Sequence, residues 1–161
     1  TMPFFATAGS KVFIGGVLAM KGTDFIETDF DTQVWTEIGS LDSIGSFGDT
    51  AQAITASIVN EGRDKTIKGT RSAGTMELVA HADYADAGQI ALLAAEKTKH
   101  DFAFKVEFND APEGGTNSQR LFIGKVMSAA EALDQANNTM KLNGSVAINS
   151  NIVRIAAAAV P

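Results

Sequence analysis

The stretch Asp101-Phe102-Ala103-Phe104-Lys105-Val106-Glu107-Phe108 alternates large apolar side chains with small or charged ones. A period of two is typical of an extended strand, because successive side chains of a strand point to opposite faces. Four large apolar side chains then share one face, and each contributes about 1.5–3 kcal/mol when it is fully buried. The stretch predicts a half-buried β-strand in a mainly β protein.

Similar alternation recurs along most of the chain. Asn60–Asp64 has the length and glycine content of a hairpin loop, and Ala111–Ser118 forms a longer turn-rich loop. Gly144 interrupts an apolar face, which indicates a bulge or a close approach of another element. Further strands are expected at residues 11–15, 34–41, 53–59, 66–70, 75–81, 120–127 and 140–148.

One helix is expected from Ala87 to about Lys97. Asp86 can accept a hydrogen bond from the first turn, and Gln89 follows at the spacing of a capping box. Its apolar stripe is expected to consist of Ile90, Leu93 and Ala94. A second helical turn is expected near residues 129–135. Together these elements predict a mainly β (α+β) fold, an antiparallel β-sandwich or barrel flanked by one α-helix.

The length of 161 residues suits a single domain, residues 1–161, with two segments outside its compact body. Met20–Gln33 is acidic, yet it carries apolar side chains at Phe25, Ile26 and Phe30. It is either a disordered excursion or a protruding loop that docks on a partner, and in the second case its apolar residues can be replaced without loss of the fold. The C-terminal arm, residues 149–161, either packs on its own body or adds to a neighbour's edge strand through Ile152, Val153 and Ile155.

The composition argues against several classes of protein. The chain has no cysteine, so it has neither a disulfide framework nor a thiolate metal site. Its net charge is −6 and its Lys and Arg side chains form no stripe, so tight DNA binding is not expected. No apolar run approaches the roughly 20 residues that span a bilayer, and we expect no membrane anchor.

The residue types that carry catalysis or bind cofactors form no pattern either. The two histidines, His81 and His100, lie at the ends of expected elements and have no paired spacing. The acidic residues between Met20 and Gln33 lack the glycine and the terminal glutamate of an EF-hand loop, so a solvated acidic loop is favoured. Trp35 opens a strand and is expected to be a core or interface anchor. We predict no enzyme, no catalytic residue, no cofactor and no metal site.

Five short motifs follow one another in a fixed order and mark the ends and bends of the expected elements. They are Trp35-Thr36-Glu37-Ile38-Gly39, Ile44-Gly45-Ser46-Phe47-Gly48-Asp49, Lys68-Gly69-Thr70-Arg71-Ser72-Ala73-Gly74, Asp86-Ala87-Gly88-Gln89 and Phe122-Ile123-Gly124-Lys125-Val126-Met127-Ser128. In this order, over residues 33–150, the chain resembles the major tail tube proteins of long, non-contractile-tailed bacteriophages, the siphophages. Each motif alone is weak, and the order and spacing carry the resemblance.

The resemblance implies a structural virion protein whose subunits form six-membered rings, which stack into the tail tube. It implies assembly in the host cytoplasm around the tape measure protein, contacts with tail terminator and tail-tip proteins, and transient passage of DNA during ejection. An acidic lumen would not retain that DNA. It further implies that the long loop and the terminal arms bridge rings, and we expect subunit contacts at Phe25, Ile26, Phe30, Trp35, Ile152, Val153 and Ile155.

Two alternatives stay open from the sequence. One is a related ring-forming protein, such as a tail terminator, a baseplate ring or a secretion-system tube, which shares the fold. The other comes from a different class, the carbohydrate-binding β-sandwiches. That class needs exposed aromatic side chains, and the chain has one Trp and one Tyr.

Overall fold

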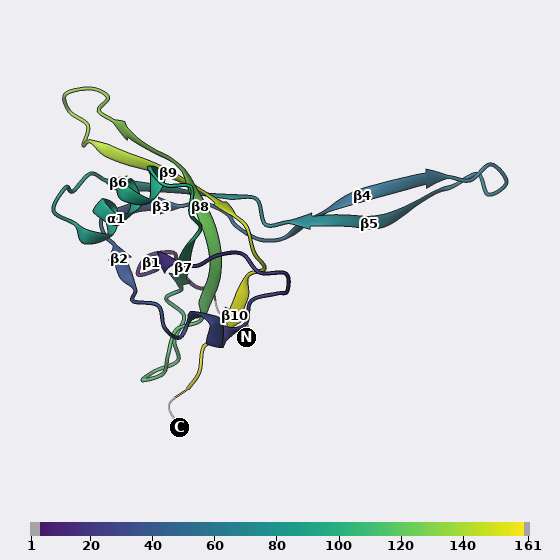
Figure 1. Cartoon of the computed structure of the whole chain (residues 1–161), viewed down its shortest axis with the longest axis horizontal. Coiled ribbons are helices and arrows are strands. Elements are labelled where there is room, and N and C mark those ends of the chain that lie inside the picture. Colours follow the sequence, from purple (N-terminus) through teal and green to yellow (C-terminus); the bar gives the residue numbers. More distant parts are fainter. Residues whose placement is uncertain (1–3, 160–161) are drawn as a thin grey trace.

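The computed structural model describes residues 4–159. Residues 1–3, and residues 160–161 of the predicted C-terminal arm, lie outside the described residues. Within the described part, eight strands form one antiparallel sheet in the order β2-β1-β7-β8-β9-β6-β3, with β10 paired to β8 (Figure 1). These strands are β1 (Lys11–Val17), β2 (Thr36–Ile38), β3 (Leu41–Ile44), β6 (Thr75–His81), β7 (Phe102–Glu107), β8 (Gln119–Ala132), β9 (Lys141–Ile148) and β10 (Val153–Ile155).

Strand β7 confirms the alternation of the opening stretch. Phe104 and Val106 are buried in the larger of two apolar cores, and Phe102 packs at its margin. The ring of Phe104 stacks on that of Phe122 in β8, with centroids 5.9 Å apart. Ala103, on the opposite face of β7, is buried in a second, smaller core. The sheet is therefore covered on both faces, which its alternation alone did not predict.

The larger core collects side chains from both ends of the sheet. Ile38 of β2 and Leu78 of β6 are buried in the same cluster, although their strands lie far apart in the strand order. The sheet must therefore curl around this cluster. The predicted fold class, mainly β and antiparallel with one flanking α-helix, is confirmed, in the form of one curled main sheet.

Helix α1 (Ala87–Glu96) closes the larger core on one side, and its start is as predicted. The Asp86 carboxylate accepts from the N–H of Gln89 at 2.9 Å and from the N–H of Gly39 at 3.0 Å. Gly88 lies so close to β2 that an added Cβ would stand 2.1 Å from the carbonyl oxygen of Glu37. A glycine is required there because the helix backbone packs directly on the strand.

The predicted apolar stripe of α1 is wrong at Ile90 and Ala94, which are exposed, whereas Leu93 packs against the larger core from its margin. Its buried face consists of Gly88, Gln89, Leu92 and Ala95, whereas Ile90 is 51% exposed. Gln89 is buried because its Nε2 donates to the carbonyl oxygens of Gly39 and His81, both at 3.0 Å. The stripe was misplaced because a buried amide with backbone partners looks polar in the sequence.

Two further expectations differ from the structure. The region expected as a helical turn, residues 129–135, begins with the end of β8, where Ala129 pairs with Gly144 and Ala132 with Lys141 of β9. The expected strand 34–41 is split into β2 and β3 by Ser40, whose φ of 57° no regular strand adopts. The close approach expected at Gly144 is confirmed, because an added Cβ would lie 3.1 Å from Leu92 of α1.

A long hairpin leaves the main body between β3 and β6. It consists of β4 (Thr50–Ser57) and β5 (Asp64–Ser72), which form a separate two-stranded sheet. Figure 1 shows it extending away from the curled sheet, with its turn at the far end. The expected strands and the hairpin loop at residues 60–64 are confirmed. The sequence did not predict that they would lie outside the body.

Candidate subunit-contact surfaces

Five of the seven residues predicted to contact other subunits lie together on one side of the main sheet. Phe25 and Phe30 are 5% and 3% exposed and form the smaller core with side chains from β7 and β8. The remaining three pack against that core from its edge and are Trp35, Val153 and Ile155. Phe30 lies between the other two aromatic rings, with its centroid 5.7 Å from that of Phe25 and 6.4 Å from that of Trp35.

The segment Met20–Gln33 therefore does not protrude, and we correct that expectation. Its short 3₁₀ helix η1 (Glu27–Phe30) turns the chain so that both phenylalanines face the sheet. Burying two such rings against the chain's own strands stabilises the segment more than exposing them in a loop. Only Ile26 among its predicted contact residues points to solvent, at 59% exposure.

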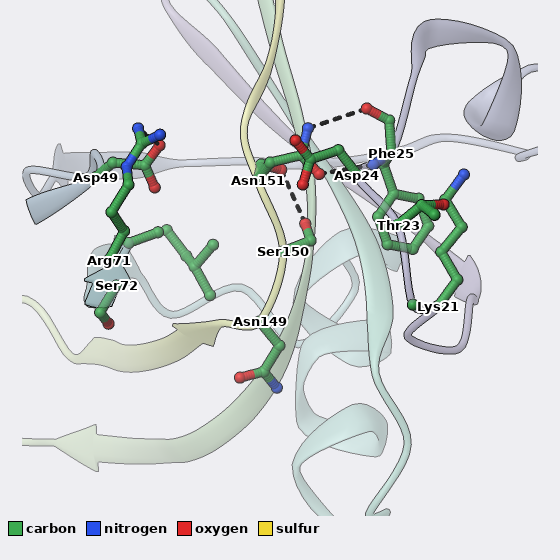
Figure 2. A pocket seen from close by; sticks show the side chains of 13 residues that line it. Lys21, Thr23, Asp24, Phe25, Asp49, Arg71, Ser72, Asn149, Ser150 and Asn151 are labelled. Atoms are coloured by element: carbon green, nitrogen blue, oxygen red, sulfur yellow. Dashed lines mark hydrogen bonds and ion pairs between the residues drawn. The ribbon is translucent and has the colours of Figure 1, made fainter. Parts of the chain in front are cut away.

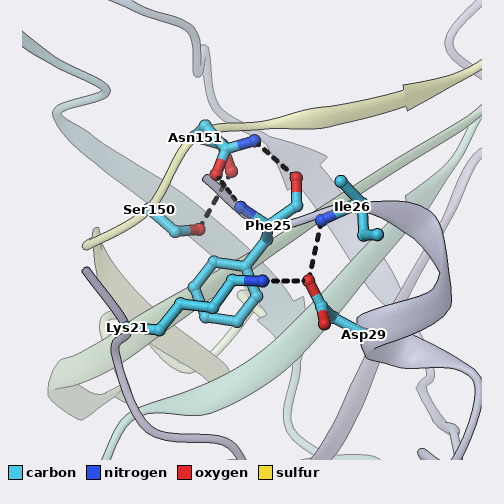
Figure 3. Close-up of polar contacts among 6 residues, drawn as sticks. All are labelled: Lys21, Phe25, Ile26, Asp29, Ser150 and Asn151. Atoms are coloured by element: carbon cyan, nitrogen blue, oxygen red, sulfur yellow. Dashed lines mark hydrogen bonds and ion pairs between the residues drawn. The ribbon is translucent and has the colours of Figure 1, made fainter. Parts of the chain in front are cut away.

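An amide side chain fastens this segment to the C-terminal region. The Oδ1 atom of Asn151 accepts from the N–H of Phe25 at 2.7 Å, and its Nδ2 atom donates to the carbonyl oxygen of Phe25 at 2.9 Å (Figure 3). The neighbouring Ser150 hydroxyl accepts from the N–H of Ile123 in β8 at 2.9 Å. Residues far apart in the sequence thus hold one another on the outer face of the sheet.

Asp29 organises the exposed end of the same segment. Its carboxylate pairs with Lys21 at 2.5 Å and accepts from the N–H of Ile26 at 2.8 Å (Figure 3). The Lys21 ammonium, together with the Ile26 N–H, holds the pKa of Asp29 below its ordinary value. Beside the smaller core, burial lowers the pKa of Lys105, whose ammonium lies 4.4 Å from the ring centroid of Phe13 and 5.2 Å from that of Trp35.

The described part of the C-terminal arm packs on its own body in the isolated chain, which is the first of the two alternatives left open by the sequence. Strand β10 pairs antiparallel with the start of β8, Val153 opposite Leu121 and Ile155 opposite Gln119. Ile152 packs at the margin of the larger core. No neighbour is needed to cover these side chains in the isolated chain, so their role in subunit contacts stays a prediction.

Sequence reasoning missed the most exposed apolar pair on a strand, which lies on the β4–β5 hairpin. Ile54 and Ile67 face each other across the two strands and are 52% and 64% exposed. The opposite face is polar, with Thr55 bonded to Thr66 at 3.3 Å. The sequence signal that could have marked this hairpin is its charge. Residues 50–72 contain four basic and two acidic residues in a chain of net charge −6.

At the base of the hairpin lies an open cavity of about 460 Å³. Its walls come from three parts of the chain: residues 21–25, the hairpin ends around Asp49 and Arg71, and residues 148–151 (Figure 2). Arg71 of β5 and Asp49, the residue before β4, form an ion pair at 2.6 Å. The hairpin base and the start of the segment 20–33 are thus neighbours in one chain.

Among residues 4–159, no group of three or more His, Asp or Glu side chains is arranged to hold a metal ion. In the same range, no helix has the length and apolar character needed to cross a bilayer. Trp35 packs against the smaller core, and the Tyr84 hydroxyl donates to Glu131 at 2.6 Å. Trp35 is partly buried there, whereas Tyr84 is 53% exposed.

The sequence matches no family model. No curated protein matches it in sequence. Solved structures do match the fold. A chain of the SPP1 tail tube superposes with a TM-score of 0.67 at 11% identity, covering 94% of this chain and 79% of that one. A chain of the anti-feeding prophage tube-terminating cap gives 0.67 at 11% identity, covering 97% and 93%.

A third match comes from an extracellular contractile injection system. A chain of its extended sheath–tube complex, named PVC, superposes with a TM-score of 0.64 at 9% identity, covering 95% of this chain and 92% of that one. The fold is thus that of the tube and terminator proteins of tails and injection systems. Within that class, the predicted likeness to a siphophage tail tube protein is confirmed at the level of the fold.

Proposed function

We propose that this chain is a structural, non-enzymatic subunit of a virion tail, which assembles with copies of itself into rings and, by stacking, into a tube. The fold of tail tube and terminator proteins supports this proposal. The observation that carries it is the β4–β5 hairpin, a two-stranded sheet outside the body with two exposed isoleucines. An isolated two-stranded hairpin is at best marginally stable in water, so a neighbouring subunit supplies the missing cover.

The finer features of the proposal follow from the resemblance. The proposal includes rings of six subunits and assembly around a tape measure protein. It also includes contacts with terminator and tail-tip proteins and the passage of DNA. The predicted contact residues Ile26, Trp35, Val153 and Ile155 lie on the outer side of the sheet around the smaller core. They remain candidates for contacts between stacked rings.

Electron microscopy of the purified chain over a series of concentrations tests the proposal. We expect rings or tubes in the wild type. A variant that joins Ala51 to Arg71, which pair across the hairpin, by an Asn-Gly turn should stay monomeric with an unchanged circular dichroism spectrum of the body. A wild type that sediments as a monomer at every concentration would refute the proposal. Single rings that never stack would favour a tail terminator over a tube subunit.

A further inference from the structure

We propose that the β4–β5 hairpin of one copy binds to the acidic segment Met20–Gln33 of a second copy, through Ile54, Ile67 and the basic side chains beside them. This inference rests on the proposed function and names the two surfaces that form its repeating contact. It follows from exposure, from charge and from the position of both surfaces in one chain.

The first of the two surfaces, the donor surface, is one face of the hairpin. Ile54 and Ile67 form a cross-strand pair. Ile54 lies over Gly69, and a Cβ added to Gly69 would stand 3.0 Å from the Cδ1 atom of Ile54. Ala56 and Lys65 continue this face toward the turn. Apolar cross-strand pairs stabilise sheets when they are covered, so an exposed pair on a thin arm indicates a docking face.

Charge selects the kind of partner. Residues 50–72 contain four basic and two acidic residues, whereas the rest of the chain contains nine basic and seventeen acidic residues. The hairpin therefore carries net positive charge in an otherwise negative molecule, and the body of another copy is complementary to it in charge. Complementary potentials speed association and suppress wrong pairings.

The acceptor surface is the segment that the sequence singled out. Met20–Gln33 contains four acidic residues and one basic residue, and that basic residue, Lys21, is already paired with Asp29. Asp24, Glu27 and Asp31 are exposed, and none of them forms an ion pair with another described residue. Ile26 lies between the first two of them and is 59% exposed, as is Met20 at the start of the segment. An exposed apolar side chain among carboxylates is complementary to an apolar pair with Lys65 on the same face.

The same chain cannot make this contact with itself in the observed arrangement. The hairpin base lies beside residues 21–25 at the cavity, but the strands then run away from the body (Figure 1). Ile54 and Ile67 therefore stay uncovered unless a second copy is present. Because donor and acceptor are different surfaces, the contact is head-to-tail and repeats from copy to copy, as a ring or a filament requires.

Charge reversal on each surface tests the pairing. The donor variant is Arg63→Glu with Lys65→Glu and Lys68→Glu, and the acceptor variant is Asp24→Lys with Glu27→Lys and Asp31→Lys. Each variant alone should raise the critical concentration for assembly by at least about tenfold, as measured by sedimentation and electron microscopy. A mixture of the two should assemble, because every reversed hairpin then finds a reversed segment. A chain with all six changes has the wild-type net charge of −6 and should also assemble.

A matched control reverses three exposed carboxylates elsewhere, Glu96→Lys, Glu113→Lys and Asp134→Lys, and should assemble like the wild type. If wild type assembles and either variant assembles at the wild-type concentration, this inference is overturned while the proposed function stands. If the control variant is as defective as the acceptor variant, net charge and not the segment controls assembly, which also overturns it. Binding of the hairpin to DNA, lost in the donor variant with assembly unchanged, would replace the second copy by nucleic acid as the partner.

Discussion

Segment Met20–Gln33 and hairpin 50–72 are both long excursions from the main sheet, and the structure treats them in opposite ways. Phe25 and Phe30 fold back and are buried on the chain's own sheet, whereas Ile54 and Ile67 stay exposed on an extended arm. The sequence predicted the reverse, a protruding segment and an ordinary strand pair. A large apolar side chain in a sequence indicates that other residues bury it. Only the tertiary structure shows whether those residues belong to the same chain.

The physical difference lies in what each excursion meets. Segment Met20–Gln33 meets the outer face of the sheet at Ala103, Leu121 and Ile123. Asn151 accepts from the N–H of Phe25 and donates to its carbonyl oxygen. The hairpin satisfies its own backbone between two strands, and beyond its base these strands form a separate two-stranded sheet. One excursion completes the fold of the subunit, and in the proposed assembly a second copy covers the other.

The largest expected effect concerns the buried side of this comparison. Phe30→Ala should lower the free energy of unfolding by about 3–5 kcal/mol, because it removes a buried ring and leaves a cavity between Phe25 and Trp35. Phe4→Ala is the control, since that ring is 98% exposed, and it should change little. Urea unfolding monitored by circular dichroism measures both. Equal values for the two variants would restore the protruding-loop interpretation of the segment.

A smaller effect is expected where the segment is fastened. Asn151→Ala removes two hydrogen bonds to Phe25 and leaves the partly buried backbone of Phe25 unpaired. This should lower the free energy of unfolding by about 1–3 kcal/mol. Asn138→Ala is a matched control, because Asn138 is exposed and its side chain makes no hydrogen bond with another described residue. Hydrogen exchange should show faster exchange at the Phe25 amide in the first variant only. Unchanged exchange there would mean that the ring alone holds the segment.

The stability of segment Met20–Gln33 at low pH depends on Asp29. Its folded pKa lies below its ordinary value, so its contribution to stability is present above the unfolded pKa and is lost as the pH falls through the folded one. The Lys21 and Ile26 contacts should therefore loosen only below about pH 3.8, the ordinary pKa. Two-dimensional NMR of the Ile26 amide follows this transition, and Asp29→Asn should abolish it. A transition at neutral pH would contradict the assignment.

The sequence predicted the fold class, most strands and the helix start, because these depend on local periodicity and capping at residues such as Phe104 and Asp86. It predicted the fold-level likeness through the order and spacing of five short motifs. It misplaced the stripe of α1, because Gln89 is buried through bonds to carbonyl groups that only the tertiary fold brings near. It also chose Phe25 and Phe30 as contacts that could be replaced without loss of the fold, and their burial makes that expectation wrong. Residues 50–72 were read correctly as a hairpin, and their position outside the body has no local signal except charge.

The smallest expected effect on stability belongs to the hairpin. Ile54→Ser with Ile67→Ser should change the free energy of unfolding of the monomer by no more than about 0.5 kcal/mol, because both side chains already face water in the isolated chain. The same variant should lose assembly, since these side chains gain their cover only from a second copy. Thr55→Ser with Thr66→Ser alters the opposite face of the same strands and is the control for both measurements. A large loss of monomer stability would show that the isoleucines are covered within one chain, and the contrast between the two excursions would disappear. A stable monomer that no longer assembles would show that the two excursions differ in which copy of the chain completes them.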